Sequence, residues 1–198
     1  DLMKKGSLLI ALAYVRHYTD VSKQCAEKGI DFISMDVIPR TTLAQKMDAL
    51  SSQANLAGYK SVLLAANELR KIFPMLMTAA GTIKPAKVVI MGAGVAGLQA
   101  LGTAKRLGAV VEVSDVRPAV KEEVQSLGGK FIEVETDASM QDAGGYAKEA
   151  SEEFLKKQKA VIFKHVTEAD IVITTALVPG RKAPVLVTEE MVKNMRPG

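Results

Sequence analysis

The sequence has little that would build a disulfide framework or a base-stacking surface. It contains one cysteine and no tryptophan, and only 5% of its 198 residues are aromatic. A single cysteine, Cys25, excludes an internal disulfide and is typical of a reducing compartment, so we expect it to be a small apolar residue on a helix. The net charge is +4, but the scarcity of aromatic residues argues against nucleic acid as a partner.

Long hydrophobic runs and metal-ligand spacings are also missing. No apolar run reaches the roughly 20 residues of a membrane-spanning helix. The run LLIALAYV near the start has the length of a strand, and Arg16 and His17 follow it, which argues against a signal peptide. His17 and His165 lie far from other ligand-spaced residues, so we expect no metal site. Because there is no initial methionine, we expect a fragment of a longer chain.

Strand-like apolar runs alternate with helix-like segments along the chain. One helical segment begins near Asp20, a candidate cap, and ends at Gly29, and another begins near Pro118. This alternation predicts an α/β fold with a parallel sheet and crossover helices. The strand-like runs lie at residues 7–15, 30–37, 87–92, 110–115, 130–135 and 170–177.

The longest helical pattern runs from about residue 44 to 73. Roughly 30 helical residues at 1.5 Å each span about 45 Å, so we expect this helix to join two domains. Residues 1–50 would be part of an N-terminal α/β domain. Residues 51–198 would form a Rossmann-type, doubly wound parallel sheet that is truncated at its C-terminal end. One shared face is predicted for Leu56, Tyr59, Leu63, Ala66, Leu69 and Phe73.

A glycine pattern follows the strand-like run at residues 87–92. It reads Gly92-x-Gly94-x-x-Gly97 and opens a helix with an apolar stripe. The first glycine allows a tight turn, the second lets a pyrophosphate approach the backbone, and the third allows close helix–sheet packing. The helix N-terminus presents free N–H groups to the phosphates. The pattern predicts a dinucleotide site.

An acidic residue, Asp115, ends the next strand-like run, 18 residues beyond Gly97. Its carboxylate is expected to accept hydrogen bonds from the adenosine ribose and to repel a 2′-phosphate, which favours NAD(H) over NADP(H). The neighbouring Arg117 blurs this preference. FAD remains the rival cofactor.

A polar loop, PRTTLAQKMDALSS, precedes the long helical pattern. Arg40 and Gln45 can bind a nicotinamide carboxamide or a phosphate, Asp48 can fix Arg40, and Ser51 adds a hydroxyl group. The residues alone leave a second interpretation open, in which Thr41, Thr42 and Asp48 only cap a helix.

Several separate stretches resemble the NAD(H)-binding component, domain I, of proton-translocating NAD(P) transhydrogenase. They include MDVIPRTTLAQKMDALSSQANLAGYKSVLLAA, VVIMGAGVAGLQALGTAKRLGAVVEVSDVRP, GGYAKE and TTALVPGRKAPVLVTEEMV. Alanine dehydrogenase is a related family that shares the fold and the glycine loop. The match covers nearly the whole chain from about Gly29.

The resemblance implies roles for matching positions. Arg40, Gln45 and Asp48 would be the catalytic residues around the nicotinamide, with Ser51 beside them. Gly145 and Tyr146 would lie on a mobile loop that closes over the nucleotide. The remaining cofactor-binding positions would be Gly92, Gly94, Val95, Gly97, Asp115, Val116, Arg117, Gln158 and Leu177.

The resemblance also implies the reaction and the partners. The reaction would be direct hydride transfer between NAD(H) and NADP(H), with NADP(H) held on a separate component and a membrane component coupled to proton movement. The chain would be a homodimer and a soluble domain peripheral to a mitochondrial inner membrane (matrix side) or a bacterial plasma membrane (cytoplasmic side). Alone, we expect it to lack full activity. The alternatives are an alanine dehydrogenase-like amino-acid dehydrogenase and a non-catalytic NAD sensor.

Overall fold

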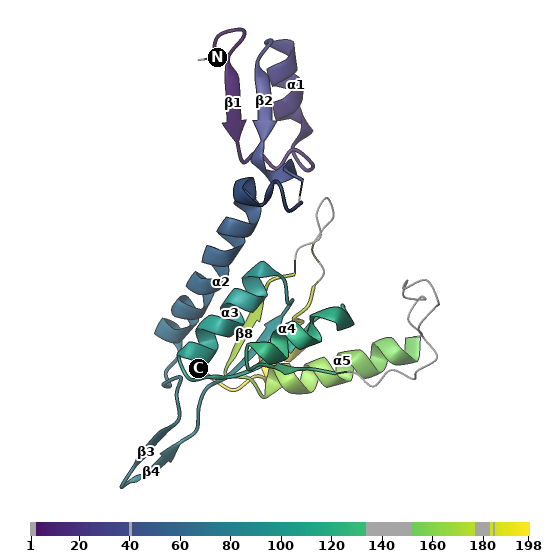
Figure 1. Ribbon diagram of the computed structural model, residues 1–198. Coiled ribbons are helices and arrows are strands. Elements are labelled where there is room, and N and C mark those ends of the chain that lie inside the picture. The colour runs from purple at the N-terminus through teal and green to yellow at the C-terminus, as the bar shows by residue number, and fades with distance from the viewer. Residues whose placement is uncertain (1–2, 40, 134–151, 177–182, 184) are drawn as a thin grey trace. The chain divides into compact units, whose positions relative to one another are not determined.

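The computed structural model describes residues 3–39, 41–133, 152–176, 183 and 185–198 (Figure 1). The chain divides into two compact units, of which the first includes Asp1–Leu56 and the second includes Ala57–Ala176 and the end of the chain. A domain boundary at residue 50 stays a prediction.

The first unit contains a parallel β-α-β arrangement. Strand β1 (Leu8–Ala11) pairs with β2 (Asp31–Ser34), and helix α1 (Thr19–Glu27) connects them. Cys25 is buried on α1, as predicted. Asp20 is not the cap: Tyr18 is the N-cap residue, and Asp20 lies in the first helical turn, where its negative charge suits the helix dipole.

The connection from β2 to the long helix contains two short 3-10 helices, η1 (Met35–Val37) and η2 (Gln45–Met47). Helix α2 then runs over Ala49–Glu68. The prediction of a continuous helix over about 44–73 is therefore wrong in length. Asp48 interrupts it, because its backbone has ψ of 82° and its carboxylate accepts bonds from the Ser51 N–H at 2.9 Å and the Ser51 hydroxyl at 2.6 Å.

The buried face of α2 also differs from the predicted stripe. Leu56 and Tyr59 are 59% and 47% exposed, whereas Gly58 and Val62 are buried. The sequence pattern makes Gly58 a weak point of the helix. In the second unit, a Cβ at Gly58 would lie 2.1 Å from the Ala96 carbonyl oxygen, so glycine allows α2 to pack against the next helix.

The second unit is built on a four-stranded parallel sheet of order β7-β6-β5-β8. Its strands are β5 (Lys87–Met91), β6 (Val110–Ser114), β7 (Lys130–Phe131) and β8 (Ile171–Thr174). The chain moves from β5 outward through β6 and β7, then crosses to the other side of β5. This is the strand order of a doubly wound sheet, and the predicted fold class is confirmed.

Helices cover both faces of this sheet (Figure 1). On one face, Val88 and Ile90 pack with residues of α2, α3 (Val95–Arg106) and the pair η3 (Pro118–Val120) and α4 (Lys121–Ser126). On the other, Val89 and Met91 pack with α5 (Glu152–Thr167) and α6 (Glu189–Asn194). Because both faces are buried, β5 is a continuous apolar run rather than an alternating one.

The sequence pattern missed an antiparallel hairpin between α2 and β5. Strand β3 (Leu76–Thr78) pairs with β4 (Gly81–Ile83). Its two connecting residues are Ala79 and Ala80, which lack the Asn-Gly or Asp-Gly signal of a tight hairpin turn. Gly81 has φ of +134°, a conformation that glycine adopts readily.

A charged cluster lies under the sheet on its α5 side. Glu112 accepts a bond from Lys87 Nζ at 3.0 Å, and its Oε2 lies 2.6 Å from His165 Nδ1. Burial acts to raise the pKa of Glu112, but these two partners outweigh it and lower the pKa. His165 therefore joins α5 to β6.

Asp170 binds three segments at the amino-terminal edge of the sheet. Its Oδ2 accepts bonds from Lys71 Nζ and from the Lys87 N–H, both at 2.8 Å, and Arg196 Nη1 lies 3.8 Å from Oδ1. The side chain is only 11% exposed. Burial acts to raise the pKa of Asp170, but the bonds from Lys71 and Lys87 outweigh it and lower the pKa.

We expect Asp170→Asn to lower the free energy of unfolding at neutral pH by about 1.5–3 kcal/mol, because hydrogen bonds to a charged group are lost. Since the folded-state pKa is depressed, the native advantage is present above the unfolded pKa of about 3.9 and is lost as pH falls through the folded pKa. Urea unfolding across a series of acidic pH values measures both effects.

The matched control is Glu189→Gln. Glu189 pairs with Lys193, but both side chains are exposed, so the expected change is within about 0.5 kcal/mol. Equal losses for the two variants, or a constant gap between native chain and Asp170→Asn at every pH, would contradict this role for Asp170.

Candidate nucleotide-binding site

The carboxyl ends of β5, β6 and β8 meet at one edge of the sheet. The Gly92 N–H donates to the Ser114 carbonyl at 2.8 Å, and the Thr175 N–H donates to the Met91 carbonyl at 2.9 Å. Strand β5 lies between β6 and β8, so the direction of strand order reverses here. In open α/β sheets, ligands bind in the crevice at such a switch point.

Two glycines of the turn after β5 are required by close packing. Gly92 has φ of +111°, and a Cβ there would lie 2.7 Å from Thr175 Oγ1. A Cβ at Gly97 would lie 1.8 Å from the Gly92 carbonyl oxygen. Larger residues at these positions would push α3 away from the sheet.

The middle glycine is not required by packing. Gly94 is the N-cap residue of α3, in an extended conformation, and a Cβ there would meet nothing within 4 Å. It offers no side chain to cap the helix, and the first intrahelical bond runs from the Leu98 N–H to the Gly94 carbonyl. The N-terminus of α3 therefore faces open space with its positive dipole end, a geometry suited to an anion.

Thr175, at the end of β8, completes the turn and was not predicted from the sequence. Its hydroxyl donates to the Gly92 carbonyl at 2.9 Å. Adjacent threonines after an apolar strand were the only signal available. The role depends on β8 lying beside β5, which the spacing of the residues does not reveal.

Asp115 follows β6 and lies beside the glycine turn. Its Oδ2 accepts a bond from the Ala93 N–H at 2.7 Å, which holds the turn in place. Arg117 donates three further bonds to the same carboxylate, from its backbone N–H, Nε and Nη2, at 2.8, 3.0 and 3.0 Å. The Asp115 side chain is 7% exposed and the Arg117 side chain 58%.

These contacts set the charge state of Asp115. Burial acts to raise the pKa of the carboxyl group, but the bonds from Arg117 and Ala93 outweigh it and lower the pKa. The bonds to Asp115 in turn raise the pKa of Arg117. Asp115 is thus an anion that Arg117 already neutralises, so a ribose hydroxyl would have to share or replace bonds from Arg117.

Two other predicted residues flank this pair of elements. Val116 is 84% exposed, between Asp115 and Arg117. Val95 is the first residue of α3 and is half-buried. Both lie at the carboxyl edge of the sheet, where the prediction requires them.

The polar loop is described within the first unit. Gln45 is exposed and begins η2. Asp48 bonds to Ser51, and its carbonyl accepts a bond from the Ser52 hydroxyl at 3.0 Å. Asp48 therefore caps α2, the second interpretation of this loop, and its contact with Arg40 stays a prediction.

Some predicted residues lie outside the described residues: Arg40, Gly145, Tyr146 and Leu177. Gln158 lies within α5, but its side chain is not described.

Within the described ranges, no group of three or more His, Cys, Asp or Glu residues is arranged to hold a metal ion. The helices of the same ranges include none with the length and apolarity of a membrane span.

A doubly wound parallel sheet with a glycine turn at its switch point defines a Rossmann-type α/β protein. The chain belongs to the alanine dehydrogenase/PNT family. Residues 1–57 match "Alanine dehydrogenase/PNT, N-terminal domain", and residues 61–198 match "Alanine dehydrogenase/PNT, C-terminal domain".

Similar proteins within the family carry two different names. The chain is 53% identical to an NAD(P) transhydrogenase subunit alpha protein of Rhodospirillum rubrum, covering 100% of this chain and 52% of that protein. A transhydrogenase structure from Sinorhizobium meliloti is 49% identical, with a TM-score of 0.85 over 98% of this chain and 52% of the other. An L-alanine dehydrogenase structure is 28% identical, with a TM-score of 0.74 over 100% and 50%.

The chain spans about half the length of the relatives that it matches. Identity is higher to the transhydrogenases than to the alanine dehydrogenase, which favours the first branch of the family.

Proposed function

We propose that this chain is the NAD(H)-binding component of a transhydrogenase and contributes to direct hydride transfer between NAD(H) and NADP(H). The observation that carries the proposal is the open space at Gly94, in front of the uncapped N-terminus of α3 and beside Asp115. The similarity to transhydrogenase alpha subunits supports the same interpretation.

The residues present fit a dinucleotide. The N–H groups of the first turn of α3, which begins at Val95, would bind the pyrophosphate, since Gly94 adds no side chain to keep it away. Asp115 would accept bonds from the adenosine ribose, with Val116 and Arg117 beside it. Gly145, Tyr146, Gln158 and Leu177 would complete the enclosure of the cofactor.

NAD(H) supplies the hydride when it is bound, and the chain's own residues orient the ring. Direct transfer requires the two nicotinamide rings to approach to roughly 3–3.5 Å in the correct alignment. Arg40 and Gln45 would hold the carboxamide of the ring. Asp48 would fix Arg40 while it also caps α2.

The proposal includes partners. Several relatives are named as alpha subunits of NAD(P) transhydrogenase, and that name implies further subunits. We assign NADP(H) to one separate component and proton movement to a membrane component, with this chain as a peripheral domain and a homodimer. The membrane would be a mitochondrial inner membrane or a bacterial plasma membrane.

Calorimetric titration with NADH and with NADPH tests the cofactor assignment. We expect NADH to bind more tightly to the native chain. Asp115→Asn keeps an oxygen for the Ala93 N–H but removes the charge, so NADH affinity should fall about tenfold while NADPH affinity does not fall.

Glu122→Gln is the matched control, because Glu122 is an exposed carboxylate at the start of α4. It should leave both affinities unchanged. Equal binding of NADH and NADPH to the native chain would contradict the assignment of Asp115.

An activity assay separates the two branches of the family. The chain is mixed with the NADP(H)-binding component of a transhydrogenase, and transfer from NADH to a thio-NADP⁺ acceptor is followed. A second mixture contains the chain, alanine and NAD⁺ alone. Turnover only in the second mixture would replace the proposal with an alanine dehydrogenase function.

A further inference from the structure

The β3–β4 hairpin exposes apolar side chains on both of its faces. Leu76 and Ile83 are paired across the strands and are 44% and 45% exposed. Met77 and Met75, two residues apart on the other face, are 75% and 57% exposed. A hairpin on a protein surface ordinarily buries one apolar face and turns a polar face to water. Here neither face is buried by the described residues.

The hairpin also has free strand edges. Each strand has three residues, and β3 and β4 pair only with each other among the strands that the structure describes. Figure 1 shows the hairpin extending away from the four-stranded sheet of the same unit. Two short strands alone are marginally stable, and an unpaired edge is a template for another strand. A partner surface would satisfy both needs.

The charge pattern identifies the partner as a second copy of this chain. The stretch Pro74–Ile83 contains no charged residue, while Lys71 and Lys84 flank it. In a two-fold contact, each patch meets its own copy, so a charged patch would repel itself. An uncharged hairpin on a chain of net charge +4 avoids that repulsion. An acidic partner would find no cation within the hairpin itself.

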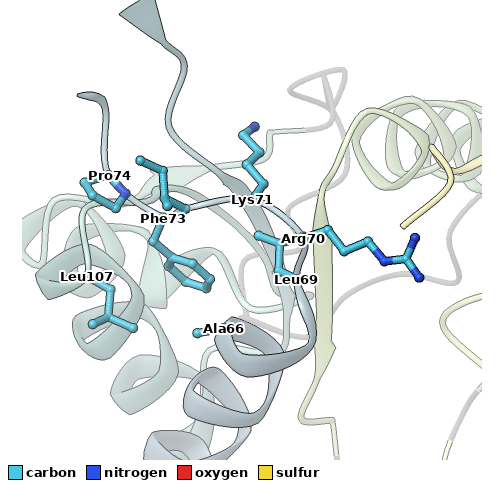
Figure 2. A pocket seen from close by; sticks show the side chains of 8 residues that line it. Ala66, Leu69, Arg70, Lys71, Phe73, Pro74 and Leu107 are labelled. Atoms are coloured by element: carbon cyan, nitrogen blue, oxygen red, sulfur yellow. The ribbon is translucent and has the colours of Figure 1, made fainter. Parts of the chain in front are cut away.

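A pocket lies at the base of the hairpin, where Pro74 leads into β3. Its volume is about 510 Å³. Figure 2 shows the Phe73 ring directed between Ala66 and Leu107, with the Arg70 guanidinium group extending away. The lining is mostly apolar: Ala66, Leu69, Ile72, Phe73, Pro74 and Leu107, with Arg70 and Lys71.

We propose that two copies of the chain associate through their β3–β4 hairpins, arranged antiparallel about a two-fold axis. Antiparallel alignment places the tip of each hairpin, Ala79 and Ala80, at the base of the other, where the apolar pocket lies. Leu76, Met77 and Ile83 are then removed from water on both copies. Burial of apolar area supplies the driving force.

This inference deepens the homodimer of the proposed function and does not depend on hydride transfer. Sedimentation velocity of the native chain over a range of concentrations tests it. We expect a dimer, and we expect Met77→Glu to raise the dimer Kd by about tenfold or more, because two like charges would be buried. Ile83→Lys tests the other face of the hairpin in the same way.

Val192→Glu is the matched control, since Val192 is 56% exposed on α6 of the same unit. It should leave the dimer Kd unchanged, and far-UV circular dichroism should be the same for all variants. A native chain that stays monomeric, or equal Kd values for Met77→Glu and Val192→Glu, would overturn the inference. NADH titration of the same samples reports on the cofactor site separately.

Discussion

Gly97→Ala is expected to weaken NADH binding by roughly a hundredfold, because a small displacement of binding groups has an effect of that order. The added Cβ would lie 1.8 Å from the Gly92 carbonyl oxygen and 3.0 Å from Thr175 Oγ1. Neither the turn nor the helix can absorb that overlap, so α3 must move away from β5. Overpacking of this kind also lowers the free energy of unfolding by about 1–3 kcal/mol.

Gly102→Ala on the same helix is the control. A Cβ there would meet only Arg106 Nη1, at 4.0 Å. Because alanine favours a helix over glycine, this variant should be equally stable or more stable by up to about 1 kcal/mol, with unchanged NADH affinity. Calorimetric titration and urea unfolding measure both variants. Normal NADH affinity in Gly97→Ala would exclude the turn after β5 as the cofactor site.

Arg40→Ala is expected to slow hydride transfer about tenfold to over a hundredfold in the assembled enzyme. A charged hydrogen bond contributes about 1.5–3 kcal/mol, and that range converts to these rates. Stopped-flow measurement of transfer between NADH and an NADP⁺ analogue, with the NADP(H) component present, gives the rate. The pyrophosphate site of the second unit should be unaffected, so NADH binding should change less than the rate.

Lys46→Ala serves as the control for charge in the same loop. Lys46 is an exposed cation in η2 and has no assigned role in the site. Its removal should leave the rate within twofold, as is usual for exposed positions, or about 0.5 kcal/mol. A rate for Arg40→Ala equal to that of Lys46→Ala would remove Arg40 from the site.

The sequence was most informative where local pattern and fold agree. The β5–turn–α3–β6 segment combines an apolar strand, fixed glycine spacing and a terminal acid, each with its own physical cause. The strand order and the helices on both faces followed from that segment and from the alternation of elements. The close contacts at Gly92 and Gly97 account for two of the three glycines.

The sequence was less informative where side chains decide the outcome. Helical spacing extended the long helix back to Ala44, because spacing does not show that Asp48 turns its carboxylate to Ser51 and starts the helix anew. The hairpin was missed because Ala79 and Ala80 carry no turn signal. The ion pair between Asp115 and Arg117 has a partner two residues away, yet its three bonds depend on rotamers.

The parallel pairing of β5 with β8 has a consequence for how the protein is made. Thr175 and Gly92, which bond across these strands, are 83 residues apart. At a synthesis rate of roughly 5–20 residues per second, about 4–16 s pass between emergence of the two strands from the ribosome. During that interval Val89 and Met91 lack their cover from α5 and α6, so the nascent chain is adhesive in a way that the finished protein is not.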